Sequence, residues 1–447
     1  MLRHLMLERC VLARANKVAT SIPIHFKLFT WLVFGLPVLG FGQAYTITDL
    51  GTLGGSYSEA HGINNSGAVA GDWDPGSSPF TRAFYYQHGT SSDLGTLGGI
   101  YAVAYGINDA NQVVGEASLA GDLNIRAFIW SNGVMSSLGV LGGSYSSAHG
   151  IDKFGQVVGE SSINPSSPNT VYAFIYTGGG MTSPAGLQPL GGNYSSANSI
   201  NSAGVIVGQT SVVPANGVTN IHAFVYTNGL GVMRELGTLG GGYSNARAIN
   251  DAGIIVGEAE VVIGGVTNLH AFVYTNGVGV MRDLGTFGGS ASSASAINSA
   301  NQVVGYAYDP SSTSEAFLYD GSNMLNLIDY VPASAGWTNL VSADGINDAG
   351  QITGSGLLTN GAYHAFLLTP AAPRITLGWP TMLPNGQFQL SVQGMPGLRF
   401  AILVSTNLSL ASWISLYTNT LSGTSTNYAD TAAGGWACRY YRAQWLP

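Results

Sequence analysis

Short apolar runs separated by clusters of glycine, asparagine, aspartate and serine follow one another along most of the chain. Runs such as Val113–Gly115 and Ala223–Tyr226 are only a few residues long, and they show no helical period. Strands bounded by turn residues have this pattern, whereas helices need longer runs with one apolar face. The pattern therefore predicts an all-β protein.

The runs belong to a repeat. Its most regular element is Gly-Ile-Asn, with some variation around the isoleucine, and successive isoleucines are 44 to 49 residues apart. The seven isoleucines are Ile63, Ile107, Ile151, Ile200, Ile249, Ile297 and Ile346. Each copy continues with a Val-Val-Gly-like run and an Ala-Phe run, and most copies are preceded by Asp-Leu-Gly-Thr-Leu-Gly-Gly or a variant of it. These runs predict four strands per repeat: a around Gly-Ile-Asn, b at Val-Val-Gly, c at Ala-Phe, and d leading into Asp-Leu-Gly. Four strands in 44 to 49 residues is the size of a β-propeller blade.

The two ends of the repetitive region complement each other. Residues 45–50 form a d strand that no a, b or c strand precedes, and the last copy ends at Leu368 after its c strand. We therefore expect a seven-bladed β-propeller over residues 45–370, closed by the N-terminal strand and followed by a small β-sandwich. An open β-solenoid is the alternative, and it would not need complementary ends.

The N-terminus has the pattern of a secretory signal. Five basic residues precede the apolar run Leu28–Phe41, and small residues, Gly42 and Ala44, stand at the two positions that a signal peptidase reads. The run is shorter than the roughly 20 residues of a membrane span, so we interpret residues 1–44 as a signal peptide cleaved after Ala44. An uncleaved anchor is the alternative. No later segment has the length of a span, and we expect an extracellular or outer cell-surface protein.

Residues 374–447 show alternating strands and turns such as Pro384–Gly386, which predict a small β-sandwich. The stretch Ser405–Leu408 and the ending Tyr440–Ala443 resemble a C-terminal module of secreted surface proteins from Verrucomicrobia-like bacteria. The resemblance implies an accessory, fibronectin-like domain. A structural cap for the propeller is the other interpretation.

The triplet His-Ala-Phe stands at 222–224, 270–272 and 364–366. Together with Asp-Leu-Gly-Thr-Leu-Gly-Gly and Gly-Ile-Asn, this triplet makes residues 45–370 resemble the HAF family of extracellular bacterial repeats. The resemblance implies an exported protein. It implies no established chemistry.

Charge narrows the choice of function. Charged residues are 9% of the chain, against roughly 25% in typical soluble domains, and glycine accounts for 63 of 447 residues. Beyond Ala44 there are ten basic and 22 acidic residues, a formal net charge of −12, which argues against nucleic-acid binding. The apolar content of 45% argues against disorder. We expect a monomer.

Signals for catalysis are few. The sequence has no nucleophile elbow, phosphate-binding loop, dinucleotide fingerprint or histidine pair with zinc spacing. Asp72–Gly76 comes closest to a calcium loop but lacks the later ligands. We therefore expect no enzyme activity, no cofactor and no metal.

An aromatic residue recurs just after the d-to-a link, on the propeller face that the d-to-a and b-to-c loops share. A ring of exposed aromatics there would stack on sugars or protein side chains, whereas buried ones would pack between blades. The candidates are Tyr57, Tyr101, Tyr145, Tyr194, Tyr243 and Trp337.

Polar side chains flank the b-to-c loops, whose variable length is typical of binding surfaces on a rigid scaffold. The candidates are Glu116, Glu160 and Glu258 on b strands, and Arg126, His222 and His270 on c strands. We expect cross-strand pairs such as Asp72/Arg82, Glu116/Arg126 and Glu258/His270, of which the exposed ones would contribute less than about 1 kcal/mol. The residue before Gly-Ile-Asn differs in most copies, which suits either an asymmetric ligand funnel or a neutral solvated position.

These observations favour a secreted or cell-surface binding protein that recognises a glycan or a protein on that face. Two alternatives remain: a polysaccharide-acting lyase or hydrolase, and a purely structural or adhesive surface protein. A glycosidase needs two carboxylates about 5–10 Å apart, and the repeated glutamates do not single out such a pair.

Overall fold

The computed structural model describes residues 11–12, 45–76, 80–121, 124–213, 217–227, 231–275, 279–371, 376–378, 381–383, 387–394, 399–405, 413–423, 425–432 and 438–445. Within them the regular elements are strands and the short 3-10 helices η1 (Ala185–Leu187), η2 (Leu327–Tyr330) and η3 (Ala333–Ala335). The all-β prediction is confirmed. The expected signal peptide falls outside the described residues, apart from the two-residue strand β1 (Val11–Leu12).

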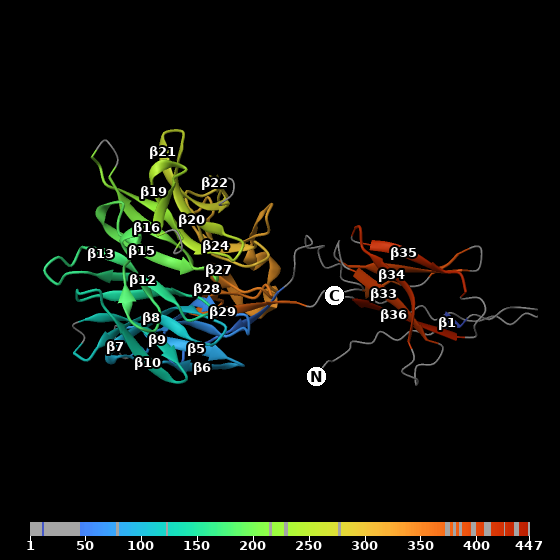
Figure 1. Ribbon diagram of the computed structural model, residues 1–447. Helices are drawn as coiled ribbons and strands as arrows, with labels where there is room; N and C mark the ends of the chain where they lie inside the picture. The colour runs from blue at the N-terminus through green and yellow to red at the C-terminus, as the bar shows by residue number, and fades with distance from the viewer. Residues whose placement is uncertain are drawn as a thin grey trace, which may run out of the picture. The chain divides into compact units, whose positions relative to one another are not determined.

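The chain forms two compact units, Ala44–Pro370 and residues 371–447 with β1 (Figure 1). In the second unit, one sheet has the order β1-β36-β33-β34, and the other contains β30, β31, β32 and β35. Leu390 and Val392 of the second sheet pack with Phe400 and Ile402 of the first in one core. The strands are β30 (Thr376–Leu377), β31 (Thr381–Met382), β32 (Phe388–Gln393), β33 (Arg399–Ser405), β34 (Ile414–Thr420), β35 (Ser425–Asp430) and β36 (Cys438–Trp445).

In the larger unit each of the first six sequence repeats forms four strands that pair antiparallel in chain order, named a to d. Repeats 1 to 3 contain β3 (Ser58–Ile63), β4 (Val69–Trp73), β5 (Arg82–Gln87) and β6 (Thr90–Asp93); β7 (Gly98–Ile107), β8 (Val113–Leu119), β9 (Ile125–Ser131) and β10 (Val134–Gly139); and β11 (Ser146–Ile151), β12 (Val157–Ser162), β13 (Val171–Tyr176) and β14 (Met181–Thr182). Repeats 4 and 5 contain β15 (Gly191–Ile200), β16 (Val205–Val212), β17 (Asn220–Thr227) and β18 (Val232–Gly237); and β19 (Gly240–Ile249), β20 (Ile254–Ile263), β21 (Val266–Thr275) and β22 (Val280–Asp283).

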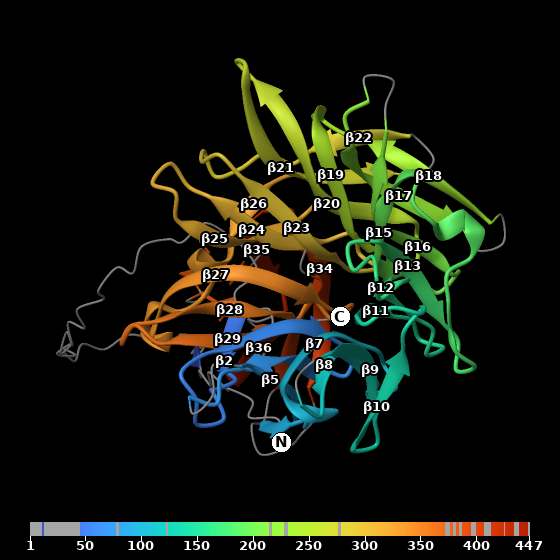
Figure 2. The same cartoon turned by 90° about the vertical axis from the view of Figure 1, so that its left-hand side faces the viewer.

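Repeat 6 contains β23 (Ser292–Ile297), β24 (Val303–Tyr308), β25 (Ser314–Tyr319) and β26 (Met324–Asn326). Repeat 7 supplies only β27 (Trp337–Ile346), β28 (Ile352–Leu358) and β29 (Tyr363–Pro370). The N-terminal strand β2 (Tyr45–Asp49) pairs antiparallel with β29, from Tyr45 opposite Pro370 to Asp49 opposite Phe366. In Figure 2 the strands of successive repeats follow one another around the unit, and the fold is propeller-like.

Asparagines join the a-to-b turns of neighbouring repeats. The Asn64 side chain donates to the Asn108 carbonyl at 3.0 Å, and Asn250 donates to Asn298 in the same way. Asn347 of repeat 7 donates to the carbonyl of Asn64 in repeat 1, also at 3.0 Å. Each side chain also accepts backbone N–H groups of its own turn, as Asn250 does from Ile254. The asparagine of Gly-Ile-Asn thus holds both its hairpin and the next repeat.

One repeat departs from this pattern. Asp152 stands where the others have asparagine, and a carboxylate has no N–H to donate. Its Oδ1 accepts from the backbone of Phe154 and Gln156, but Oδ2 is buried without a hydrogen-bond partner in the described structure. The link between repeats 3 and 4 therefore lacks this hydrogen bond.

Glycines of the b strands let strands a and b approach closely. A Cβ on Gly257 would lie 1.9 Å from the carbonyl oxygen of Asn245, and the same position in the other repeats has a contact of 1.9–2.0 Å. Van der Waals contact requires more than about 3 Å, so a side chain does not fit here. This geometry explains the glycine of Val-Val-Gly.

Candidate functional site

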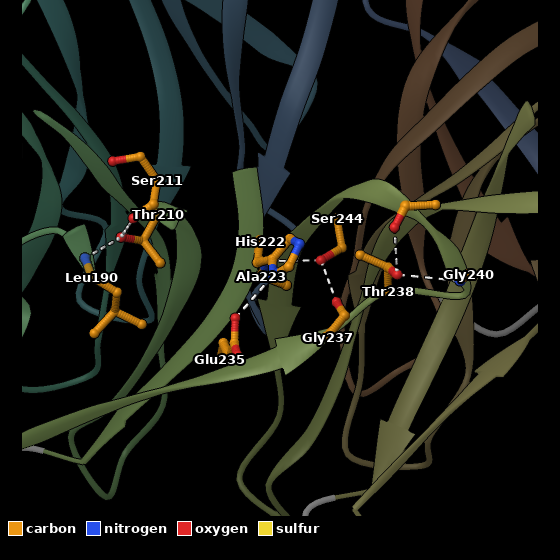
Figure 3. A network of polar contacts seen from close by, with 11 residues as sticks. Leu190, Thr210, Ser211, His222, Ala223, Glu235, Gly237, Thr238, Gly240 and Ser244 are labelled. Atoms are coloured by element: carbon orange, nitrogen blue, oxygen red, sulfur yellow. Dashed lines mark hydrogen bonds and ion pairs between the residues drawn. The ribbon is translucent and has the colours of Figure 1, made fainter. Parts of the chain in front are cut away.

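The His-Ala-Phe motif connects neighbouring repeats (Figure 3). In repeat 4 the backbone N–H of Ala223 donates to the Ser244 hydroxyl of repeat 5 at 2.8 Å, and that hydroxyl donates to the carbonyl of Gly237. The Phe224 side chain is fully buried in the core. His222 Nδ1 lies 2.8 Å from Glu235 on the d strand. The same serine bridge recurs at Ser58, Ser146, Ser195 and Ser292.

The expected pairs between b and c strands are not the ones that form. Glu116 lies opposite Ala127, and Arg126 lies opposite Ala117. Because side chains alternate between the two faces of a strand, this one-residue offset places the glutamate and the arginine on opposite faces of the sheet. The Asp72/Arg82 and Glu258/His270 predictions are wrong for the same reason, since these residues also lie one register position apart.

The basic residues of the c strands instead contact carboxylates on d strands or backbone carbonyls. Arg82 pairs with Asp93 at 2.8 Å, His270 with Asp283 at 2.8 Å, and His364 with Asp49 of β2 at 2.8 Å. Arg126 donates to the carbonyls of Ile125 and Ser144. Of the candidate ligand-binding residues, Arg126, His222 and His270 thus make structural contacts away from the b-strand carboxylates.

The b-strand carboxylates meet the recurrent tyrosines. Tyr101 donates to Glu116 Oε1 at 2.6 Å, and the Tyr145 hydroxyl lies 3.3 Å from Glu116 Oε2 and 3.2 Å from Glu160 Oε1. Tyr194 donates to Glu160 Oε2 at 3.0 Å. These five residues form a continuous chain of hydrogen bonds across repeats 2 to 4, which we call the tyrosine–glutamate belt.

The belt has few positive charges. Glu116 is 8% exposed, and no ion pair is found for Glu116 or Glu160 within the described residues. In repeat 5 the arrangement changes: Glu258 accepts from Tyr243 at 3.3 Å and from the Arg247 guanidinium at 2.9 Å. Repeats 2 and 3 therefore hold carboxylates that accept from neutral tyrosine hydroxyls.

Burial and the nearby carboxylates act on the tyrosines. Burial, reinforced by the charge of Glu116, raises the pKa of Tyr101 and Tyr145 well above the usual value. Burial and Glu258 raise the pKa of Tyr243 to about 12. The hydroxyls of the belt are therefore protonated donors at every physiological pH.

The aromatic ring predicted from the sequence is uneven. Tyr57, Tyr101, Tyr145, Tyr194 and Tyr243 are half-buried, and the last four donate to carboxylates. Trp337 is only 7% exposed and packs edge-on against Phe366 in the core. The six aromatics therefore do not form one exposed stacking platform, and four of the tyrosines present their hydroxyls to carboxylates.

The variable position before Gly-Ile-Asn brings neighbouring repeats together on the a strands. The His61 ring centroid lies 5.9 Å from that of Tyr105, which lies 5.7 Å from that of His149. Asn198 donates to Asn245 Oδ1 at 2.7 Å. We call this row the inner row; its members are His61, Tyr105, His149, Asn198, Arg247, Ser295 and Asp344.

One cluster was missed by the sequence analysis. Glu59 and Asp72 are direct partners in the β3–β4 pair, and His61 Nε2 lies 2.6 Å from Asp72 Oδ1. Ligand atoms of the three residues lie within 4.8 Å of one another. The sequence contained a signal, because Glu59 is an acid where the other repeats have Val103, Ser147, Ser196, Asn245, Ser293 and Ser342. The prediction rested on residues that the repeats share, and Glu59 is not one of them.

The Asp72–Gly76 segment begins at the end of β4, and its two carboxylates have different partners. Asp74 accepts from the Gly76 backbone at 2.8 Å and from Ser56. The Ser56 hydrogen bond and the Gly76 N–H lower the pKa of Asp74. Asp72 instead contacts His61.

A cavity of about 240 Å³ lies beside the a-to-b turns of repeats 1, 2, 5, 6 and 7. Its lining includes four isoleucines of Gly-Ile-Asn together with Asp109, Asp251 and Asp348. Those aspartates accept backbone N–H groups of neighbouring repeats, for example Asp251 from Ser202 at 2.9 Å. They are therefore part of the contacts between repeats.

Comparison with known proteins identifies similarities but no function. A family model described as a protein of unknown function (DUF3466) matches residues 237–369. No curated protein matches the chain. Among solved structures, TolB from Acinetobacter baumannii is 11% identical with a TM-score of 0.38, over 65% of this chain and 76% of that one. A structure described as an oxidoreductase (glucose dehydrogenase) from Thermus thermophilus is 11% identical with a TM-score of 0.32, over 72% and 99%.

The resemblances to HAF repeats and to the Verrucomicrobia-like module stay predictions. No helix among the described residues has the length and apolar character that a bilayer crossing demands.

Proposed function

We propose that residues 45–370 form a seven-bladed propeller closed by β2, and that the protein is exported and binds a glycan through the tyrosine–glutamate belt. Closure is supported by the β2–β29 pairing and by the hydrogen bond from Asn347 to Asn64. Export is supported by the N-terminal pattern and by the HAF resemblance. Binding without catalysis is the role that the sequence motifs favour.

The belt carries the glycan proposal. Glu116 and Glu160 accept hydrogen bonds from tyrosine hydroxyls, and Tyr145 has one proton to share between the two carboxylates. The carboxylates therefore retain acceptor capacity, which sugar hydroxyls would satisfy. Half-buried tyrosine rings beside them offer apolar contact, and polar groups with adjacent aromatic surface are what sugar recognition requires.

The b-to-c hairpin of repeat 5 adds a different surface. Its tip carries Val262, Ile263 and Val266, which are 49%, 53% and 60% exposed. Exposed apolar side chains on a loop of this face suit contact with the less polar face of a sugar ring or with a protein. A protein ligand would use this tip more than the belt.

A glycan array with the full chain, followed by calorimetry on the best ligand, tests the proposal. Tyr101→Phe and Tyr145→Phe remove the hydroxyls and keep the rings. Both are expected to weaken binding about tenfold or more, because the lost hydroxyl no longer holds its carboxylate in position for the sugar. Tyr172→Phe on β13, outside the belt, is the control. Absence of glycan binding, or equal affinity of all variants, would contradict the proposal.

A polysaccharide hydrolase is a second candidate because Glu59 and Asp72 form a close carboxylate pair. Burial raises the pKa of Glu59, as a general acid requires. Release of reducing ends from polysaccharide mixtures, abolished in Glu59→Gln, would favour this function over binding.

A further inference from the structure

The cluster of Glu59, His61 and Asp72 combines donors that divalent transition metals accept. One imidazole nitrogen and two carboxylates offer ligand atoms within 4.8 Å of one another. Imidazole favours zinc and related ions over calcium and magnesium, and carboxylates complete their coordination. Glu59 and Asp72 lie opposite each other on β3 and β4, and β3 also carries His61. The strands thus hold all three donors on a rigid two-stranded support.

The architecture of the repeat does not account for Glu59. Every other repeat has an uncharged residue at this position, so the fold does not need an acid there. Within the described residues Glu59 makes no hydrogen bond through its side chain, in contrast to Glu116 and Glu160, which accept from tyrosines. A half-buried carboxylate opposite another carboxylate is unfavourable unless a cation compensates for both.

A third carboxylate adds negative charge beside the cluster of Glu59, His61 and Asp72. Asp344 of repeat 7 accepts from the Ser342 hydroxyl at 2.7 Å, and its charge reaches both His61 and Glu59. His61 is the single histidine in this group, and the Arg247 guanidinium, whose charge also acts on Asp344, is hydrogen-bonded to Glu258.

We propose that Glu59, His61 and Asp72 bind a divalent transition-metal ion, with Asp344 as a nearby carboxylate that stabilises its charge. The three side chains leave coordination positions open for water or for a ligand oxygen, as in metal sites that interact with substrates. The His61 ring is oriented by its contact with Tyr105, and Ser342 orients Asp344. Such support around a metal site typically fixes the ligand geometry. This inference is independent of glycan binding by the belt.

Titration of Zn²⁺ into the full, chelator-treated chain without an affinity tag tests the site by calorimetry. The expected result is one saturable site. Glu59→Gln and Asp72→Asn preserve side-chain size and remove a donor charge, so each is expected to weaken binding by about tenfold or more. Asp93→Asn is the matched control, because it removes an acid in the same repeat that pairs with Arg82 instead. Ca²⁺ is expected to bind more weakly than Zn²⁺.

Co²⁺ provides a second, spectroscopic readout that can be taken on the wild-type chain. The wild-type chain is expected to show visible absorption bands of a bound Co²⁺ ion that Zn²⁺ displaces, and Asp72→Asn is expected to lose them. No saturable Zn²⁺ binding, or equal affinity of wild type, Glu59→Gln and Asp72→Asn, would overturn the proposal and leave the cluster as a histidine–aspartate pair beside a free acid. If Glu59→Gln does not fold, the wild-type Co²⁺ spectrum and Asp72→Asn decide the question.

Discussion

Polar side chains have different roles on the c and d strands and in the inner row of the a strands. On the c and d strands, a basic residue before Ala-Phe pairs with an acid of its own sheet, as His222 does with Glu235 and His270 with Asp283. In the inner row, the residue changes from one repeat to the next. Recurrent polar residues therefore connect the scaffold, and variable ones lie where several repeats meet. Charged residues are only 9% of this chain, and several of them serve the scaffold. The repeated residue before Ala-Phe is therefore a poor guide to function.

The strongest test of the scaffold is Gly257→Ala. The new Cβ would lie 1.9 Å from the Asn245 carbonyl, so strands β19 and β20 must separate, and we expect a loss of about 3 kcal/mol in unfolding free energy. Gly179→Ala is the control, because nothing lies within 4 Å of its added Cβ. Chemical denaturation compares the two. Equal stability of both variants would show that the close approach is not required.

Ser244→Ala breaks the contact between repeats 4 and 5 more mildly. It removes the hydroxyl that accepts from Ala223 and donates to Gly237, and it leaves a buried N–H without a partner. The expected loss is about 1–3 kcal/mol. Repeat 2 offers the natural comparison, because it has Ala102 at this position. Denaturation of Ala102→Ser should show little change or a small gain, and a loss as large as that of Ser244→Ala would contradict this view.

Asp152→Asn should make the scaffold more regular. The new amide can donate to the Asn201 carbonyl as its counterparts do, and the unpartnered Oδ2 disappears. We expect a gain of about 1 kcal/mol, measured as a rise in the thermal midpoint at neutral pH. The reverse change, Asn201→Asp, should lower the midpoint. A fall in both variants would indicate that Asp152 has a role of its own.

Stability should become sensitive to pH in the alkaline range. The pKa of Tyr243 is raised to about 12 in the folded protein, against about 10 in an unfolded chain, so the folded state retains the proton longer. Its contribution to stability is present below a pH of about 10 and declines as the pH rises towards about 12. Unfolding curves of wild type and Tyr243→Phe should therefore run parallel below that range and converge within it. Curves that stay parallel across that range would contradict this expectation.

The sequence was sufficient for the elements that repeat. The all-β class follows from short apolar runs bounded by turn residues, and the missing d strand of repeat 7 indicated where β2 pairs. The sequence was insufficient to predict on which face of the sheet each side chain lies. Glu116 and Arg126 flank one loop in the sequence, but only the register shows that a one-residue offset separates their side chains. Contacts between repeats, such as Tyr145 with Glu116, depend on packing that no single repeat encodes.

The site was hardest to predict where it departs from the repeat. Alignment of the copies emphasises shared residues, and Glu59 is visible only as an exception among six uncharged counterparts. Trp337 illustrates the opposite error. It follows a d-to-a link as the tyrosines do, but it stands nine residues before Ile346, whereas each tyrosine stands six before its isoleucine, and it lies in the core against Phe366. An aromatic residue near the same link need not have the same register or exposure.

The pairing of β2 with β29 also bears on how the chain folds. Thr46 and Thr369 are 323 residues apart in sequence yet share a hydrogen bond, so this strand pair cannot form before almost the whole repetitive region has been synthesised. Contacts of such high sequence separation are entropically costly and slow to form. The same neighbourhood means that a linker could join residues 45 and 370 and new termini could be opened at an exposed turn. A circular permutant of this kind would replace the late strand pairing with a local hairpin, and should refold faster than the natural chain order.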